Sequence, residues 1–426
     1  MGSVNDALGK VKLPPMALVR QHFPEECLKD PVKALRQELA RPEIAGLIRP
    51  GMRIAITAGS RGIDCYVPLL RELVACLKAL DAEPFIIPAM GSHGGATAQG
   101  QTALLAGYGI TEENVGAPIR ASMEVVQVDT ACGGEPVWVD RLAYEADGIV
   151  LFNRVKPHTG FRGDYESGLV KMAAIGLGKQ KGAETVHAGG PARMAERVRE
   201  FGTRAIRACN ILFGVATVEN SMDKVYALRA LTVPEIFREE PVLLETAKRL
   251  LPRLFFGKLD VLVVDRIGKN ISGPGMDPNI THTYLPGAAI PQELRAKRAQ
   301  RVAVLDLTEE THGAAMGIGM ADVTTQRLFD KLDRDVTYPN CLTSGVTVSA
   351  KIPMWFDSDK LALQAAVQTL TGADREHLRM VRILDTLHLG QIWISEALLP
   401  EAEADPNVEI LSAPVPLPFD EKGNLF

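Results

Sequence analysis

The sequence predicts an α/β protein of two α/β domains with mostly parallel sheets and with the active site in the cleft between them. Short apolar runs alternate along the chain with segments whose apolar residues recur at helical spacing, which is the pattern of β-α-β units. The 426 residues are enough for two or three domains, at about 150 residues each. A content of 46% hydrophobic and 23% charged residues is typical of a globular protein with an ample core.

The expected elements of the N-terminal half follow one another in order. Arg53–Ala58 is expected to be a buried strand because it is short, apolar and followed by glycine. Tyr66–Leu80 repeats apolar residues at helical spacing, and Glu83–Ala89 is the second expected strand. Thr97 is expected to cap a helix that begins near Ala98. Four further strands are expected, at Gly148–Phe152, Asn210–Ala216, Lys258–Asp265 and Arg301–Leu307.

A domain boundary is expected near Arg253–Lys258. A charged helical stretch, Pro234–Leu251, precedes this point, and a new strand–helix pattern follows it. We therefore expect an N-terminal α/β domain over residues 1–257 and a C-terminal α/β domain over residues 258–426.

Charge and composition argue against several classes of protein. A net charge of −5 does not suit a general nucleic-acid or membrane-surface binder. The N-terminus lacks the apolar core of a signal peptide, and no apolar run reaches the length of a membrane helix. The six cysteines are scattered without a Cys-x-x-Cys pair, which argues against a zinc ribbon or a disulfide framework. We expect a cytoplasmic enzyme that acts on a small molecule, and the sequence leaves its oligomeric state open.

Five of the eight histidines fall in loops that are polar or rich in glycine and proline. These are His93, His158, His187, His282 and His312. Glycine beside a histidine allows a ligand to approach closely, and histidine both titrates near neutral pH and binds metals. Any one of them is explained equally well as a loop histidine bonded to the backbone, but five together favour acid–base or metal chemistry. Since no His-Glu-x-x-His pattern is present, we do not expect a protease-type zinc site.

Arg61 and three lysines are further candidates. Arg61 follows the first expected strand in a glycine-rich turn, where its guanidinium is suited to bind a carboxylate through two hydrogen bonds. Lys171 lies among apolar residues, and a desolvated lysine has a lowered pKa and a reactive amine. Lys179 and Lys181 are interpreted as phosphate contacts or surface charges. The alternatives are that Arg61 is a solvated arginine in a turn and that Lys171 is a structural lysine.

The C-terminal half carries a long polar loop, Gly268–Tyr284, directly after an expected strand. A loop this long in a compact domain is usually functional. It contains Lys269 and His282, which we regard as candidate substrate contacts, and Trp355 is a candidate wall residue of the substrate pocket.

At these loops the sequence resembles the nickel-pincer nucleotide-dependent lactate racemase family, in particular its lactate-racemase-like branch of uncertain substrate. The resemblance spans most of the chain and rests on an ordered set of loops rather than on one motif. The matching residues are Arg61, the Gly-Ser-His motif at His93, the Pro-His motif at His158, Lys171, His187 sixteen residues later, and the Asp-x-Asn loop at Asp277 and Asn279.

The resemblance implies residue roles. It implies that His93 and His158 are the two catalytic acid–bases. It also implies that Lys171 tethers the pincer nucleotide and that His187 binds nickel, an ion that an imidazole and the sulfur ligands of such a cofactor would suit. The other residues expected at the cofactor are Gly91, Ser92 and Lys179, and His282 aligns with a substrate-carboxylate contact of the family.

The chain departs from the family pattern in three places. His93 is followed by two glycines where the family has Arg-Pro, and His282 stands where the family has glutamine. The link from His158 to the lysine has three extra residues, so Lys179 or Lys181 is an alternative tether. The cofactor is therefore retained, altered or absent, and the substrate need not be lactate.

The chemistry of a 2-hydroxy acid gives the expected mechanism. Its α-hydrogen is only weakly acidic, so racemisation by removal and return of hydride is easier than by deprotonation. Side chains cannot accept hydride, so a cofactor must do so, while two neutral histidines take and return the hydroxyl proton. The expected function is a racemase or epimerase of a 2-hydroxy acid or sugar acid. Two alternatives stay open: a metal-dependent or cofactor-free epimerase, dehydratase or lyase, and a non-catalytic binding protein on the same scaffold.

Overall fold

A computed structural model describes residues 4–131 and 133–426 and divides the chain into two compact units. The N-terminal unit is Pro24–Leu251, and the C-terminal unit combines residues up to Phe23 with Pro252–Phe426. The division after Leu251 lies close to the boundary expected near Arg253–Lys258. The first 23 residues differ from the expected grouping of residues 1–257, because their strand pairs with strands near the end of the chain.

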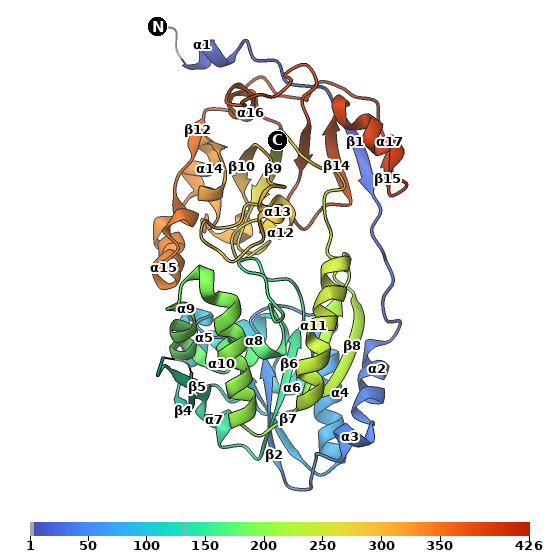
Figure 1. Cartoon of the computed structure of the whole chain (residues 1–426), viewed down its shortest axis with the longest axis vertical. Helices are drawn as coiled ribbons and strands as arrows, with labels where there is room; N and C mark the ends of the chain where they lie inside the picture. The colour runs from blue at the N-terminus through green and yellow to red at the C-terminus, as the bar shows by residue number, and fades with distance from the viewer. Residues whose placement is uncertain (1–3, 132) are drawn as a thin grey trace. The chain divides into compact units, whose positions relative to one another are not determined.

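The N-terminal unit is built on a five-stranded sheet with the order β3-β2-β6-β7-β8 (Figure 1). The first four strands run parallel, and β8 is antiparallel to β7. This confirms the expected mostly parallel α/β architecture. The strands are β2 (Arg53–Ala58), β3 (Glu83–Pro88), β6 (Gly148–Arg154), β7 (Ile211–Glu219) and β8 (Val225–Thr232), and a separate hairpin pairs β4 (Val125–Thr130) with β5 (Pro136–Asp140).

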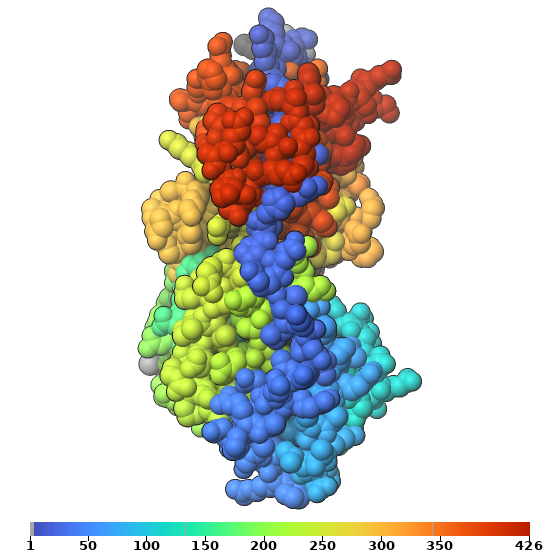
Figure 2. All heavy atoms as spheres, turned by 90° about the vertical axis from the view of Figure 1, so that its right-hand side faces the viewer, coloured from blue at the N-terminus to red at the C-terminus, as the bar shows by residue number. Residues whose placement is uncertain are grey.

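Helices cover both faces of this sheet. On one face, α2 (Pro31–Leu39) and α4 (Tyr66–Ala79) pack apolar side chains against alternate residues of the strands. On the other face, Gly214 of β7 lets Leu169 and Ile236 approach so closely that a Cβ at this glycine would lie 2.5 Å from Leu169 Cδ1. Figure 2 shows the blue segment that contains α2 on the surface of the unit. The remaining helices are α3 (Pro42–Ala45), α5 (Ala98–Gly107), α6 (Glu112–Val115), α7 (Arg141–Tyr144), α8 (Leu169–Lys171), α9 (Lys179–His187), α10 (Met194–Ala208) and α11 (Val233–Leu250).

The C-terminal unit has an eight-stranded sheet with the order β12-β11-β10-β9-β13-β14-β1-β15. The strands from β12 to β13 are parallel, whereas β14, β1 and β15 pair antiparallel. Figure 2 shows the blue N-terminal segment passing between red segments from the end of the chain. The strands are β1 (Met16–Gln21), β9 (Val261–Ile267), β10 (Arg301–Leu307), β11 (Val323–Thr325), β12 (Met354–Phe356), β13 (Met380–Ile383), β14 (Gln391–Ser395) and β15 (Val408–Ile410).

Two apolar layers enclose this second sheet. Val261 and Val263 of β9 pack with α16 (Asp359–Gln368) on one face, and Leu262 and Val264 face the other layer. Within the part of the chain that the structure describes, no helix is long and apolar enough to cross a membrane. The other helices are α1 (Val4–Leu8), α12 (Pro278–Thr281), α13 (Gln292–Arg295), α14 (Gln326–Lys331), α15 (Arg334–Ser344) and α17 (Leu399–Ala404).

Candidate functional site

Three predicted site residues follow neighbouring strands of the N-terminal sheet. In the parallel ladders, Ala58 of β2 pairs with Pro88 of β3, and β6 lies on the other side of β2. Arg61, His93 and His158 come after the carboxyl ends of β2, β3 and β6, respectively. Because these strands are parallel, their carboxyl ends share one edge, which is where α/β sheets bind ligands.

Lys171 and His187 are carried by consecutive helical segments. Lys171 ends α8, a π-helical turn spans Met172–Gly176, and His187 ends α9. Such π-helical turns are frequent at functional sites. Burial holds the pKa of His158 well below its usual range, and the charges of Lys171 and His187 act in the same direction.

The surroundings of Lys171 stabilise the neutral form of its amine relative to the charged form. Desolvation lowers its pKa to about 8, and the charges of Lys156 and Arg61 act in the same direction. A lowered pKa leaves more free amine at neutral pH, which makes a lysine nucleophilic. A Cβ at Gly59, directly after β2, would lie 3.3 Å from Met172 Cε, so the start of the turn after β2 packs against the residue that follows Lys171.

The rings of His93 and His187 each present Nε2 as an acceptor. His93 Nδ1 lies 2.8 Å from Met90 O, and His187 Nδ1 lies 2.7 Å from Ala183 O. A carbonyl oxygen only accepts, so Nδ1 is the donor in both cases and Nε2 of the neutral ring carries the lone pair. A metal-binding histidine normally makes this kind of second bond from its other ring nitrogen.

The donor set fits a metal only if a cofactor supplies further ligands. His187 offers one imidazole nitrogen near the Lys171 amine. Among the described residues, no group of three or more His, Cys, Asp or Glu side chains could hold a metal ion. A nucleotide that is tethered to the lysine and brings its own metal ligands is compatible with this arrangement.

Lys179, which was expected at the cofactor, is buried and paired in the structure. Its Nζ lies 2.9 Å from Asp140 Oδ2, both side chains are fully buried, and it also donates to Pro88 O and to Gln101 Oε1. Gln101 in turn donates to the carbonyl oxygens of Gly91 and His93. Lys179 therefore supports the loop that carries His93 from within the fold, because buried partners occupy its ammonium group.

Gly91 explains how this loop approaches the helical segment. Its φ is +60°, in the left-handed region that favours glycine. A Cβ at this position would lie 3.2 Å from Ile175 Cγ2 and 3.4 Å from Ala183 Cβ. The loop with Ser92 and His93 thus packs against the turn between Lys171 and His187. Lys181, the other lysine considered as a tether, places Nζ 3.9 Å from the centre of the Trp138 ring.

The C-terminal unit holds the remaining predicted residues. The Lys269 N–H donates to Thr311 Oγ1, and His282 directly follows α12 with a φ of +55°. Trp355 stacks on Phe329 with ring centres 4.9 Å apart. Trp355 belongs to the edge strand β12, which β10 and β11 separate from β9, so it does not follow the same strand as Lys269 and His282.

Three supporting residues were missed by the sequence reasoning. Arg197 donates to Thr185 O and Val186 O in the last turn of α9, and Glu240 of α11 accepts from the N–H of Val170. Gln101 is the third, through its bonds beneath the His93 loop. For Arg197 and Glu240, a glycine packed against the side chain is the signal that the sequence offered. A Cβ at Gly189 would lie 2.2 Å from Arg197 Cδ, and one at Gly168 would lie 2.1 Å from Glu240 Oε1.

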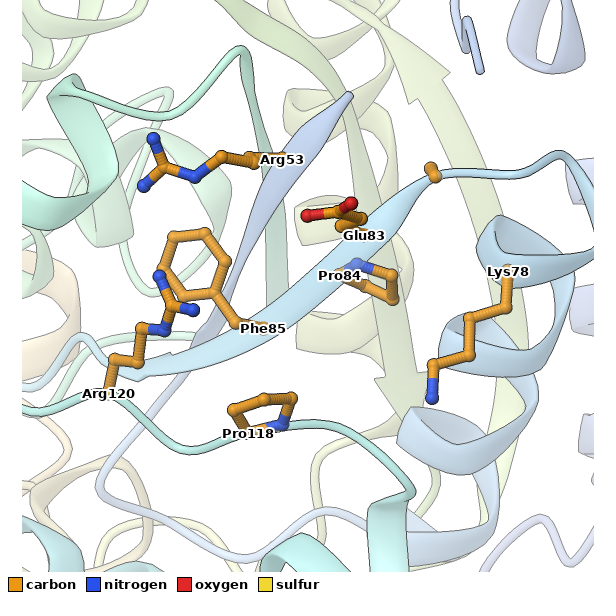
Figure 3. Close-up of a pocket in the computed structure, with 8 residues that line it drawn as sticks. Arg53, Lys78, Glu83, Pro84, Phe85, Pro118 and Arg120 are labelled. Atoms are coloured by element: carbon orange, nitrogen blue, oxygen red, sulfur yellow. The ribbon is translucent and has the colours of Figure 1, made fainter. Parts of the chain in front are cut away.

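A hollow of about 230 Å³ lies at the amino-terminal ends of β2 and β3 (Figure 3). Arg53 and Glu83 are the first residues of these strands, and the guanidinium of Arg120 lies 4.7 Å from the centre of the Phe85 ring. None of the predicted site residues lines this hollow. It therefore lies at the opposite edge of the sheet from Arg61, His93 and His158.

Comparisons with known proteins agree with the fold and with the family that the loops indicated. Residues 11–196 match the family model for the lactate racemase N-terminal domain. No curated protein matches the chain. The lactate racemase apoprotein from Thermoanaerobacterium thermosaccharolyticum has a similar structure, with a TM-score of 0.54 at 12% identity over 88% of this chain and 99% of that one. A protein from Thermotoga maritima matches with a TM-score of 0.46 at 14% identity, over 64% of this chain and 70% of that one.

Proposed function

Because this chain carries a lactate racemase N-terminal domain and belongs to the lactate-racemase-like family, we propose that it is a racemase or epimerase of a 2-hydroxy acid. The observation that carries the proposal is the cluster of Arg61, His158, Lys171 and His187, whose side chains influence one another electrostatically at the edge where α/β sheets bind ligands. The family gives the reaction class, and the cluster supplies suitable groups for it.

His93 and His158 are proposed to handle the hydroxyl proton of the substrate. His93 presents the lone pair of Nε2, which suits a general base. Desolvation keeps His158 neutral at physiological pH by lowering its pKa. Arg61, which reaches solvent at the same edge, is proposed to bind the substrate carboxylate through its guanidinium.

Lys171 and His187 are proposed to hold a nickel-pincer nucleotide. Lys171 is the favoured tether because its amine has a pKa of about 8, whereas Lys179 is engaged in a buried ion pair and Lys181 lies on Trp138. His187 would bind the metal through Nε2. When bound, such a cofactor would supply the hydride acceptor that side chains lack. Gly91 and Ser92, at the start of the His93 loop, are proposed cofactor contacts.

Three residues of the C-terminal unit are proposed substrate contacts. Lys269 and His282 both follow β9 in the chain, and an amine and an imidazole suit a carboxylate or a hydroxyl. Trp355 presents an exposed apolar ring, with 47% of the residue surface accessible. The imidazole of His282 favours a substrate more polar than lactate, such as a longer hydroxy acid or a sugar acid.

Denaturing peptide mass spectrometry on protein purified from its native host tests this proposal. We expect a nucleotide-sized adduct on the peptide that contains Lys171, and none on the peptides that contain Lys179 or Lys181. The matched control is Lys171→Arg, which keeps a positive charge and must lose the adduct. An adduct on Lys179 or Lys181 instead would move the tether. Three unmodified lysines would contradict the cofactor and leave a metal-dependent or cofactor-free epimerase, dehydratase or lyase as the working function.

A further inference from the structure

We propose that Glu166 is a positioning residue that holds His158 in a single neutral tautomer, with the ring hydrogen on Nε2. The observation behind it is the closed loop between Lys156 and Ser167. The backbone groups of Lys156 and Ser167 bond to each other in both directions, at 2.9 Å and 3.1 Å, and so tie the ends of the loop together.

Glu166 directly precedes Ser167 at the end of this loop, and its side chain is fully buried. Its Oε2 accepts from the His158 N–H at 2.8 Å, and its Oε1 lies 3.1 Å from Lys248 Nζ of α11. A buried carboxylate is tolerated when cations and N–H groups compensate its charge. Here Lys248 and Arg162 are the two cations, because Arg162 also donates to Glu166 Oε2 at 3.3 Å.

The same network holds the other backbone group of His158. Arg162 donates to His158 O at 2.6 Å. Glu166 therefore binds the His158 N–H directly and the His158 C=O through Arg162. Because the N–H and the C=O of His158 are both hydrogen-bonded, the orientation of its backbone is restricted, and with it the direction in which the side chain points. Phe161 packs against the ring, with centres 4.3 Å apart and planes inclined by 29°.

The imidazole ring of His158 also accepts a hydrogen bond from the backbone. The Gly160 N–H donates to His158 Nδ1 at 3.0 Å. A backbone N–H can only donate, so Nδ1 must carry the lone pair and Nε2 the hydrogen when the ring is neutral. This is the reverse of His93, whose Nδ1 donates to Met90 O and whose Nε2 carries the lone pair.

The two histidines are therefore unequal in the resting protein. This consequence rests on the proposed function. In the first proton transfer, His93 would take the hydroxyl proton at Nε2, while His158 would direct its Nε2–H at an oxygen of the substrate as a hydrogen-bond donor. Glu166 sets this difference without touching the substrate, because it acts only through the backbone of the loop.

Nuclear magnetic resonance of the full chain with isotopically labelled histidine tests the inference without substrate or cofactor. Chemical shifts of the ring nitrogens and carbons distinguish the two neutral tautomers, and His158→Gln assigns the signal. We expect His158 to be entirely Nε2-protonated at mildly alkaline pH in the unaltered protein. In Glu166→Ala we expect the signal to move towards a mixture of both tautomers.

The matched control is Glu245→Gln, because Glu245 also contacts Lys248 Nζ, at 2.8 Å, but is exposed and does not touch the loop. Its spectrum should equal that of the unaltered protein. If Glu166→Ala does not fold, Glu166→Gln replaces it: the shape stays, the charge-assisted bonds to Arg162 and Lys248 weaken, and a measurable Nδ1-protonated fraction is expected. An Nδ1-protonated His158 in the unaltered protein, or an unchanged tautomer in the folded Glu166 variant, would overturn the inference. Neither result depends on whether Lys171 carries an adduct.

Discussion

At the scale of single residues, the chemistry of the loop histidines depends on the partner of Nδ1. A carbonyl oxygen at this nitrogen leaves an acceptor at Nε2, as in His93 and His187, whereas a backbone N–H leaves a donor there, as in His158. The sequence predicts a loop for each of these three histidines, whereas His187 ends α9 in the structure. The Nδ1 partners are backbone atoms, which no side-chain pattern in the sequence reveals. The expected chemistry of each ring therefore follows from the folded loop.

Replacing either proposed acid–base by alanine should remove activity and preserve the fold. For His93→Ala and His158→Ala we expect turnover of a 2-hydroxy-acid panel to fall by about 10²–10⁴-fold, the usual contribution of a positioned acid–base group. Chiral chromatography of the products measures the loss, and circular dichroism checks the fold. His377→Ala is the control, since its side chain is 76% exposed and bonds only to a neighbouring aspartate among the contacts described. Full activity in either of the first two variants would exclude the proposed pair.

At the scale of elements, supports from distant helices hold the short segments of the site. Glu240 of α11 accepts from Val170 N at the start of α8, directly before Lys171, and Arg197 of α10 bonds to the last turn of α9, which ends in His187. Glycines at the contact points allow this close approach. Each support joins residues more than ten positions apart, so helical periodicity did not indicate it.

Glu240 should make stability depend on pH. Burial raises its pKa from 4.5 to about 8, against the bonds from Val170 and Leu169. Between these two values the carboxyl is protonated in the folded chain but ionised in the unfolded chain, so the free energy of unfolding falls as pH rises. Glu240→Gln does not titrate, and its stability advantage should grow from about pH 4.5 to about pH 8 and then level off.

Denaturant unfolding over this pH range measures the difference between Glu240→Gln and the unaltered chain. Glu245→Gln on the same helix is the control, because this side chain is 72% exposed. A difference that shrinks as pH rises would show that the carboxylate is ionised in the folded chain.

The buried pair of Lys179 and Asp140 should be strongly coupled. Removing one partner leaves a buried charge alone, so Lys179→Met and Asp140→Asn are each expected to lower the free energy of unfolding by about 3–5 kcal/mol. The double variant should lose clearly less than the sum of the two. Denaturant unfolding of all four proteins forms the double-mutant cycle, and strictly additive losses would contradict the coupling.

At the scale of the whole molecule, the start of the chain belongs to the C-terminal unit. β1 lies between β14 and β15, and Ala17 and Val19 are fully buried in its core. The partners of this strand are more than 350 positions away in the sequence. Local patterning could not reveal that pairing, and the expected first domain accordingly began at residue 1.

Deleting residues 1–23 should therefore destabilise the C-terminal unit and spare the N-terminal one. The deletion exposes unpaired edges of β14 and β15 and removes a buried strand, so faster proteolysis within residues 252–426 is expected. Limited proteolysis with identification of the fragments compares the two units in one sample. Equal protection of the C-terminal unit with and without these residues would contradict its assignment to that unit.

Local patterns in the sequence were enough to predict most of the central strands. Apolar runs predicted β2, β3, β6, β9 and β10 within a few residues of their bounds. This is possible because the apolar pattern of a buried strand is formed by residues that are adjacent in the sequence. The positions of Arg61, His93 and His158 after strands followed from the same pattern. Which charges meet was decided only by the tertiary structure. The lowered pKa of Lys171, the buried ion pair of Lys179 and the hydrogen bond from His158 to Glu166 arise from contacts between segments that folding brings together. Electrostatic and hydrogen-bond energies depend on those distances.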